Sequence, residues 1–126
     1  MRAVDTNVLV RLITRDDQRQ TFAAEAFIEN GAWLSLLALA EAVWVLGTVY
    51  ELTPQQQANG IEMLLSHRHL VLQDRETVAA ALVQFRAKPT LGFSDCLMLE
   101  LARKAGHLPL GTFDRSLARL PGTQKL

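Results

Sequence analysis

The stretch MRAVDTNVLVRL, residues 1–12, decides the fold, because a short apolar run ends in the polar triplet DTN and turns apolar again at once. Residues 2–4 have the length of a strand, and the apolar residues at 8–13 recur with the 3.6-residue period of a helix. A phosphate-binding loop at this junction would need glycine, and this stretch contains none. The pattern predicts a strand that leads directly into a helix, with Asp5 at the carboxyl end of the strand.

Strand and helix signals of this kind recur along the rest of the chain. Further strands are predicted at 32–36, 69–73 and 108–113, and further helices at 18–29, 37–50, 54–66, 75–88 and 95–105. Strands that alternate with helices predict a mainly parallel sheet with helices on both faces. We therefore expect an α/β fold, a three-layer α/β/α sandwich with a mainly parallel central sheet, in a single domain of residues 1–126.

Several helix boundaries are indicated by capping residues. The clearest signal is a capping box followed by proline at the first helical position, formed by Thr53, Pro54 and Gln56. Three other helices are expected to begin after the caps Asp17, Asp74 and Ser94. On the helix at 18–29, the expected core face consists of Phe22, Ala23, Ala26 and Phe27.

The composition is that of a globular domain without a strong overall charge. Hydrophobic residues make up 49% of the 126, enough for a proper core, and 13 Lys and Arg balance 13 Asp and Glu. A formal net charge of zero excludes binding to nucleic acid or membrane through a uniform field. Any nucleic-acid site therefore has to be local.

Compartment and membrane contact can also be addressed from the sequence. The lone cysteine, Cys96, cannot form an internal disulfide, and the first residues lack a basic-then-apolar leader, so we expect a reducing cytoplasm. The apolar segment 32–50 has the length of a membrane span, but Glu41 lies at its centre and no Lys or Arg flanks it. We interpret it as a buried strand and helix that divide near Ser35, and expect no membrane contact.

Four of the thirteen acidic residues stand apart from the others. Asp5, Asp95 and Asp114 lie at the end of a predicted strand or at a helix start, and Glu41 lies early in a helix that follows a strand. Glu41 and Asp95 have apolar neighbours three and four residues away, so we expect their helix faces to be buried. Ligands bind at the edge of an open parallel sheet where the strands have their carboxyl ends. Four carboxylates that met at that edge would repel one another unless a cation lay among them. Oxygen-only ligands suit Mg²⁺ or Mn²⁺.

At these residues the sequence resembles the PIN-domain nucleases, and within them the VapC-type toxin ribonucleases of bacterial toxin–antitoxin pairs. VDTNVLVRL resembles the first family motif, and LALAEAVWVL the helix with the internal glutamate. GFSDCLMLELARKAG resembles the helix with the third acid, and LGTFDRSLARL the closing strand and acid. The four segments occur in the expected order over nearly the whole chain. Cys96 stands where family members often have alanine.

The resemblance implies an endoribonuclease that hydrolyses RNA phosphodiester bonds with one or two Mg²⁺ or Mn²⁺ ions. The implied catalytic and metal-binding residues are Asp5, Glu41, Asp95 and Asp114. Small polar positions that would orient the carboxylates or waters are Thr6, Asn7, Ser94 and Thr112. The implied partners are an RNA substrate, a cognate antitoxin protein and a second copy of the chain in a homodimer.

Basic and aromatic residues are candidate contacts for RNA or for a second copy of the chain. Five basic residues lie in sequence near the predicted site and are candidate RNA contacts: Arg11, Arg15, Arg86, Lys88 and Arg115. Three aromatic residues are interpreted as core or dimer-surface residues rather than as platforms on which bases stack: Trp33, Trp44 and Tyr50. A dimer contact is expected on the helices at 37–50 and 54–66, around Trp44, Val45, Val49, Tyr50, Ile61, Met63, Leu64 and Leu65.

Two other functions stay open from the residues themselves. A phosphatase could use Asp5 as a nucleophile, although Asn7 occupies the place where such enzymes usually have a second acid. The same fold could instead be a non-catalytic module that binds RNA or a protein. Cleavage that requires a metal would separate the nuclease from both. A nuclease that cuts DNA would use the same metal chemistry, so RNA is favoured by the resemblance alone.

Overall fold

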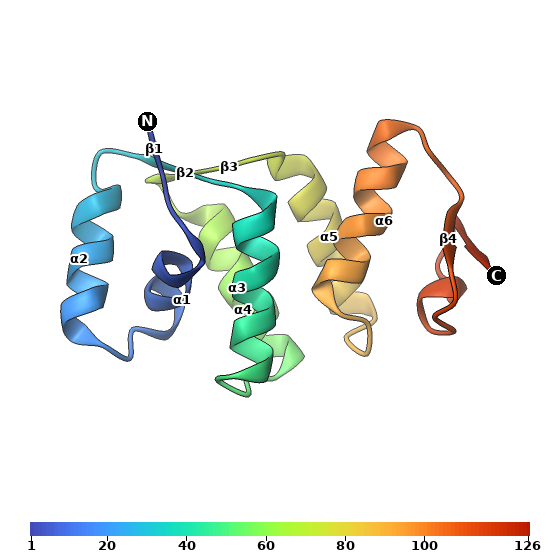
Figure 1. Ribbon diagram of the computed structural model, residues 1–126, viewed down its shortest axis with the longest axis horizontal. Helices are drawn as coiled ribbons and strands as arrows, with labels where there is room; N and C mark the ends of the chain where they lie inside the picture. The colour runs from blue at the N-terminus through green and yellow to red at the C-terminus, as the bar shows by residue number, and fades with distance from the viewer. The chain divides into compact units, whose positions relative to one another are not determined.

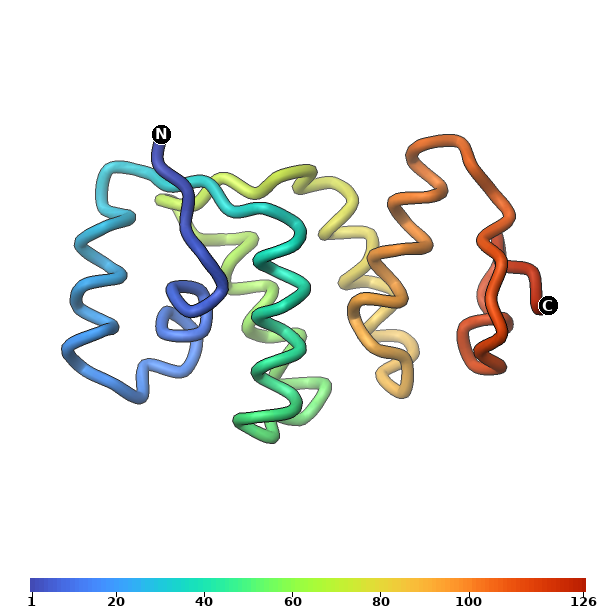
Figure 2. Tube along the Cα trace, in the orientation of Figure 1, coloured from blue at the N-terminus to red at the C-terminus, as the bar shows by residue number.

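The computed structural model describes all 126 residues and divides into two compact units, Met1–Arg75 and Glu76–Leu126. The first unit contains β1 (Arg2–Ala3), α1 (Thr6–Thr14), α2 (Gln18–Ile28), β2 (Ala32–Leu34), α3 (Leu36–Thr48), α4 (Pro54–Ser66) and β3 (Leu70–Leu72). The second contains most of α5 (Arg75–Ala87), α6 (Phe93–Ala105), β4 (Leu110–Thr112), a 3₁₀ turn (Leu117–Arg119) and β5 (Thr123–Lys125). Figure 1 labels most of these elements, and Figure 2 traces the chain through them.

Parallel strands form a sheet in each unit. In the first unit the order is β1-β2-β3, with Ala3 opposite Trp33 and Leu34 opposite Leu72. In the second unit β4 pairs with β5 in parallel, with Leu110 opposite Thr123. Strands of this kind connected by helices confirm the predicted α/β class.

The core of the first unit lies where α1 packs against α2 and α3, and α3 packs against α4. Its largest fully buried side chains are aliphatic and come from all four helices and β2: Leu9, Val10, Ile28, Leu34, Leu39, Leu46, Ile61 and Leu64. In the second unit, the Phe85 and Phe93 rings meet edge to face with their centroids 6.0 Å apart. Such edge contacts suit the charge distribution of aromatic rings and join α5 to α6.

Two of the four predicted caps are confirmed. The Asp17 side chain accepts from Gln20 N, and Thr53 and Gln56 form the full capping box. Ser35, which was not predicted as a cap, accepts from Ala38 N at the start of α3. Segment 32–50 divides at Ser35 into β2 and α3, as predicted. None of the helices combines the length and the apolar character needed to cross a bilayer.

Two predictions about helix faces and ends are wrong, and one strand was not predicted. On α2 the buried residues are Thr21, Ala24 and Ile28, while Phe22 is 75% exposed, so the expected core face is turned outward. At α6, Gly92 occupies the N-cap position and Ser94 lies in the first turn without capping the helix. The strand β5 was not among the predicted strands.

Part of the expected dimer surface belongs to the core. Ile61, Leu64 and Leu65 on α4 are buried within the molecule, so they are not available to a second copy. Trp44 on α3 and Val49, the C-cap residue just after this helix, are exposed, which means that Trp44 is not a core residue.

Candidate functional site

Asp5 lies at the junction between β1 and α1, where the sequence predicted it. It is the N-cap of α1, with extended backbone (φ −96°, ψ −178°), and its Oδ1 accepts a hydrogen bond from Val8 N at 3.3 Å. The side chain is exposed. One carboxylate oxygen is thus held by the helix start, which fixes the orientation of the group toward solvent.

The hydroxyl of Thr6 connects this junction to α3. Thr6 Oγ1 donates to Glu41 Oε2 at 2.9 Å, across 35 positions in the sequence. The two helices that carry these residues pack together, and each begins after one of the paired parallel strands β1 and β2. The sheet edge therefore brings the first acidic motif and the internal glutamate together within the first unit.

Glu41 is exposed, and the expectation of a buried carboxylate is wrong. The buried face of α3 consists of Ala38, Leu39, Ala42, Val43 and Leu46. The apolar neighbours that suggested burial, Leu37 and Trp44, share the exposed face with Glu41. The spacing of apolar residues correctly showed that Leu37, Glu41 and Trp44 share one face of α3. It could not show that no other part of the first unit covers this face.

The other two candidate acids belong to the second unit. Asp95 is in the first turn of α6 and is half-buried. Burial raises the pKa of the Asp95 carboxyl, the negative charge of Asp114 raises it further, and a hydrogen bond with the Gly92 backbone opposes both. The influence of Asp114 on this pKa indicates that the two carboxyl groups lie near each other.

Asp114 is oriented in the same manner as Asp5. Its Oδ1 accepts from Leu117 N at 2.8 Å at the start of the 3₁₀ turn, and its own N–H donates to Thr112 Oγ1 at 3.0 Å. Two of the candidate acids therefore each use one oxygen to accept a backbone N–H three residues ahead. Thr112, a predicted supporting residue, contributes to the position of Asp114.

The remaining small polar candidates lie in the first turns of helices. Asn7 is the second residue of α1 and Ser94 the second residue of α6, and both are exposed. Asp5 is the N-cap of α1 and Asp95 lies in the first turn of α6, and at both places the helix dipole favours negative charge.

Two of the five candidate RNA contacts are engaged within the first unit. Arg11 Nη1 donates to Tyr50 Oη at 2.6 Å and pairs with Asp16 at 3.3 Å, and Arg11 Nε donates to Gln20. Arg15 forms an ion pair with Glu25. The exposed candidates of the second unit are Arg86, Lys88 and Arg115.

The four acids supply the right donors for a hard divalent cation, two from each unit. Within either unit, no three His, Cys, Asp or Glu side chains are gathered closely enough to hold a metal ion. Carboxylate and hydroxyl oxygens are the ligands that Mg²⁺ and Mn²⁺ prefer, so the chemistry of each pair fits such an ion.

One groove of the first unit is separate from these acids. It has a volume of about 790 Å³ and runs between α1 and α4, lined among others by Leu12, Tyr50, Met63 and His67. Burial, together with the positive charge of His69, lowers the pKa of His67. None of the four candidate acids lines this groove.

Comparison with known proteins identifies the family. Searches against curated proteins and against solved structures gave no match. The family model of the PIN domain, a family whose members are generally nucleases that use divalent metals, matches residues 2–122. That match spans all four acidic segments, and with it the chain belongs to the PIN domain family.

Proposed function

We propose that this chain is a divalent-metal-dependent endoribonuclease that hydrolyses RNA phosphodiester bonds in the cytoplasm. The observation that carries the proposal is the hydrogen bond from Thr6 to Glu41, since it joins two of the four acidic motifs at the carboxyl ends of parallel strands. The nearness of Asp95 and Asp114 in the second unit supports it in the same way.

Asp5, Glu41, Asp95 and Asp114 would hold the cation, either Mg²⁺ or Mn²⁺. A bound divalent ion would supply positive charge to phosphate oxygens and lower the pKa of a bound water. Asp5 and Asp114 keep one oxygen on a backbone N–H, which leaves the other oriented for a ligand. Thr6 holds Glu41 by Oε2 and so limits the rotation of that carboxylate.

Asp5→Asn tests the proposal with a matched control. Asparagine caps helices as well as aspartate does, so the variant should fold and melt like the wild type while losing charge at the proposed cation site. We expect cleavage of a structured RNA to fall by at least about 10²-fold in Asp5→Asn, and to be abolished in the wild type by excess chelator. Mg²⁺ and Mn²⁺ are compared as activating ions.

Asp17→Asn is the control for the cap itself. Asp17 accepts from Gln20 N at 3.0 Å at the start of α2, so it has the same structural role as Asp5 without a proposed ligand role. The Asp17→Asn variant should cleave RNA at the same rate as the wild type. Equal cleavage by Asp5→Asn and wild type would point to a contaminating nuclease, and RNA binding without turnover would point to a non-catalytic module.

We also propose that the chain is the toxin of a toxin–antitoxin pair and forms a homodimer. The support is the resemblance of VDTNVLVRL and the three later segments to VapC-type toxins, together with exposed Val49 at the end of α3. Expression of the wild type without an antitoxin should arrest growth, and expression of Asp5→Asn should not. A sedimentation measurement that finds a monomer at micromolar concentration would contradict the dimer.

A further inference from the structure

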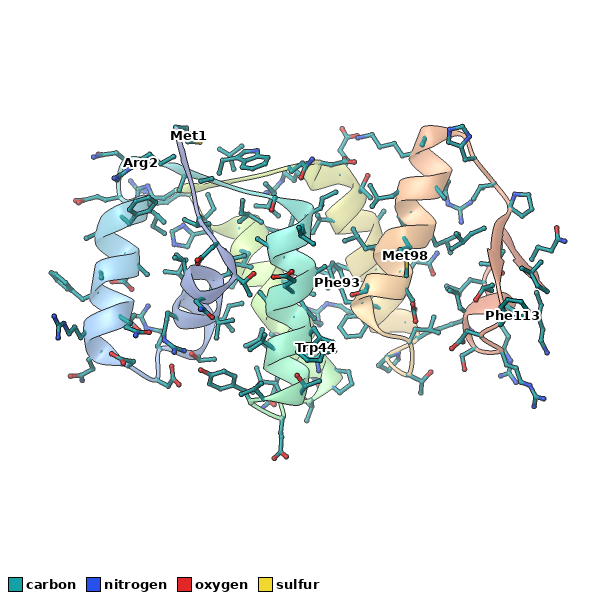
Figure 3. All side chains as sticks on the ribbon, viewed as in Figure 1. Met1, Arg2, Trp44, Phe93, Met98 and Phe113 are labelled. Atoms are coloured by element: carbon teal, nitrogen blue, oxygen red, sulfur yellow. The ribbon has the colours of Figure 1, made fainter.

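Trp44, labelled on α3 in Figure 3, follows Glu41 by three residues, which places the two on the same face of the helix. Its side chain is 65% exposed, and Leu37, one turn before Glu41, is 70% exposed. Glu41 is therefore flanked on its own helix by two exposed apolar side chains, all within the first unit. A single exposed aromatic residue is ordinary, but this one stands beside a proposed cation ligand.

The occupant of this face has to satisfy Glu41 as well as Trp44. An apolar protein surface packed over the face would strip water from a carboxylate that is held in place by Thr6, which is costly. Under the proposed function a nucleic-acid strand suits the face, because a cation held at Glu41 would bind its phosphate and the indole would face a flat nucleobase. We infer that Trp44 positions the substrate by stacking on an unpaired nucleobase beside the phosphate at Glu41, an inference that rests on the nuclease function proposed above.

This role makes Trp44 a determinant of substrate selectivity. Bases inside a duplex are already stacked on both faces, so only an unpaired base can present a face to the indole. Stacking is tolerant of base identity and varies with ring size. Cleavage should therefore favour positions next to an unpaired base, with purines preferred over pyrimidines.

Fluorescence tests the contact without any need for turnover. The chain has two tryptophans, so Trp33→Phe leaves Trp44 as the only indole, and Trp44→Phe leaves Trp33, which is 37% exposed on β2. Each variant is titrated in Mg²⁺ with a short unpaired phosphorothioate RNA that resists hydrolysis, and binding is followed independently by the anisotropy of a dye on the RNA. We expect quenching of Trp44 that saturates together with the anisotropy, and no quenching of Trp33.

Kinetics separates stacking from a merely apolar contact. Trp44→Ala and Trp44→Leu should raise KM for unpaired RNA on the order of tenfold with little change in kcat. Trp44→Phe should keep most of the wild-type KM, because phenylalanine retains an aromatic face whereas leucine retains only bulk. Phe22→Ala removes an aromatic side chain that is 75% exposed on α2, and it should leave KM unchanged.

The possible outcomes distinguish this inference from the function on which it rests. RNA binding seen by anisotropy with unchanged Trp44 fluorescence would overturn the stacking and leave the nuclease proposal intact. A wild type that neither binds nor cleaves RNA would overturn the proposed function itself. If leucine serves as well as phenylalanine at position 44, or if Trp44→Ala dissociates a dimer, Trp44 is an apolar contact and the inference is wrong.

Discussion

Thr21 on α2 is a buried threonine whose hydroxyl has no hydrogen-bond partner. Its side chain is only 5% exposed, and Oγ1 is buried. A buried hydroxyl without a partner costs about 1–3 kcal/mol, so Thr21→Val, which replaces the hydroxyl by a methyl of similar size, should raise the free energy of unfolding by about 1 kcal/mol. Urea denaturation measures the difference.

Thr77 on α5 is the matched control for this substitution. It is 3% exposed and, unlike Thr21, has an interaction partner. Thr77→Val should lower the free energy of unfolding by about 1 kcal/mol because it leaves that partner unsatisfied. A loss of stability in Thr21→Val would instead mean that a buried water satisfies the Thr21 hydroxyl.

Predictions for single residues succeeded where the cause is local. Asp17 and Thr53 are caps because their side chains reach a backbone N–H three residues ahead, and the sequence contains everything that this contact needs. Glu41 and Phe22 were wrongly assigned to buried faces because burial depends on what packs against a helix, and the spacing of apolar residues does not supply that information. The charge influence of Asp114 on Asp95 depends on spatial nearness and became visible only with the structure.

Among the elements, α4 has the best-defined beginning. Thr53 Oγ1 accepts from Gln56 N at 3.2 Å, Gln56 Oε1 accepts from Thr53 N at 2.9 Å, and Pro54 needs no hydrogen bond at the first helical position. Thr53→Ala removes the cap and should lower the free energy of unfolding by about 1 kcal/mol, measured by thermal or urea denaturation.

Ser66, the exposed last residue of α4, offers a control at the opposite end of the same helix. Ser66→Ala should change the free energy of unfolding by no more than about 0.5 kcal/mol. Equal effects of the two substitutions would show that the capping box contributes nothing specific to α4.

Helices were easier to predict than the last strand for a physical reason. The residues of α4 indicate where the helix begins and which of its faces is apolar. In contrast, β5 has the sequence TQK, which is polar and largely exposed. It is a strand because it pairs with β4, with Gly111 opposite Gln124. A strand that forms only because it pairs with a neighbouring strand has no apolar alternation in its own sequence by which it could be predicted.

At the scale of the whole molecule, cation binding should be visible as stability. A ligand that binds only the folded protein stabilises it by mass action, by about 2.7 kcal/mol at a concentration of 100 times Kd. Mg²⁺ or Mn²⁺ should therefore raise the Tm of the wild type, and should raise the Tm of Asp5→Asn less. Differential scanning fluorimetry across a cation titration measures both.

Asp17→Asn should show the full wild-type response to the cation, since Asp17 has no proposed ligand role. A Tm that responds equally in wild type and Asp5→Asn would contradict a cation site at Asp5. The fold class could be predicted from the alternation of strands and helices, and the family from the order of the four acidic segments, whereas the exposed face that carries Glu41 and Trp44 could not be predicted.

The way in which Asp5 and Asp114 are held has an evolutionary consequence. Each uses Oδ1 to accept a backbone N–H, a role that asparagine performs equally well. Aspartate and asparagine codons differ by one nucleotide, so a single transition at either position should give a chain that folds but lacks the proposed nuclease activity. The proposed activity is then a trait that one mutation removes and its reversal restores, and a folded, inactive descendant would be free to serve as a binding protein or decoy.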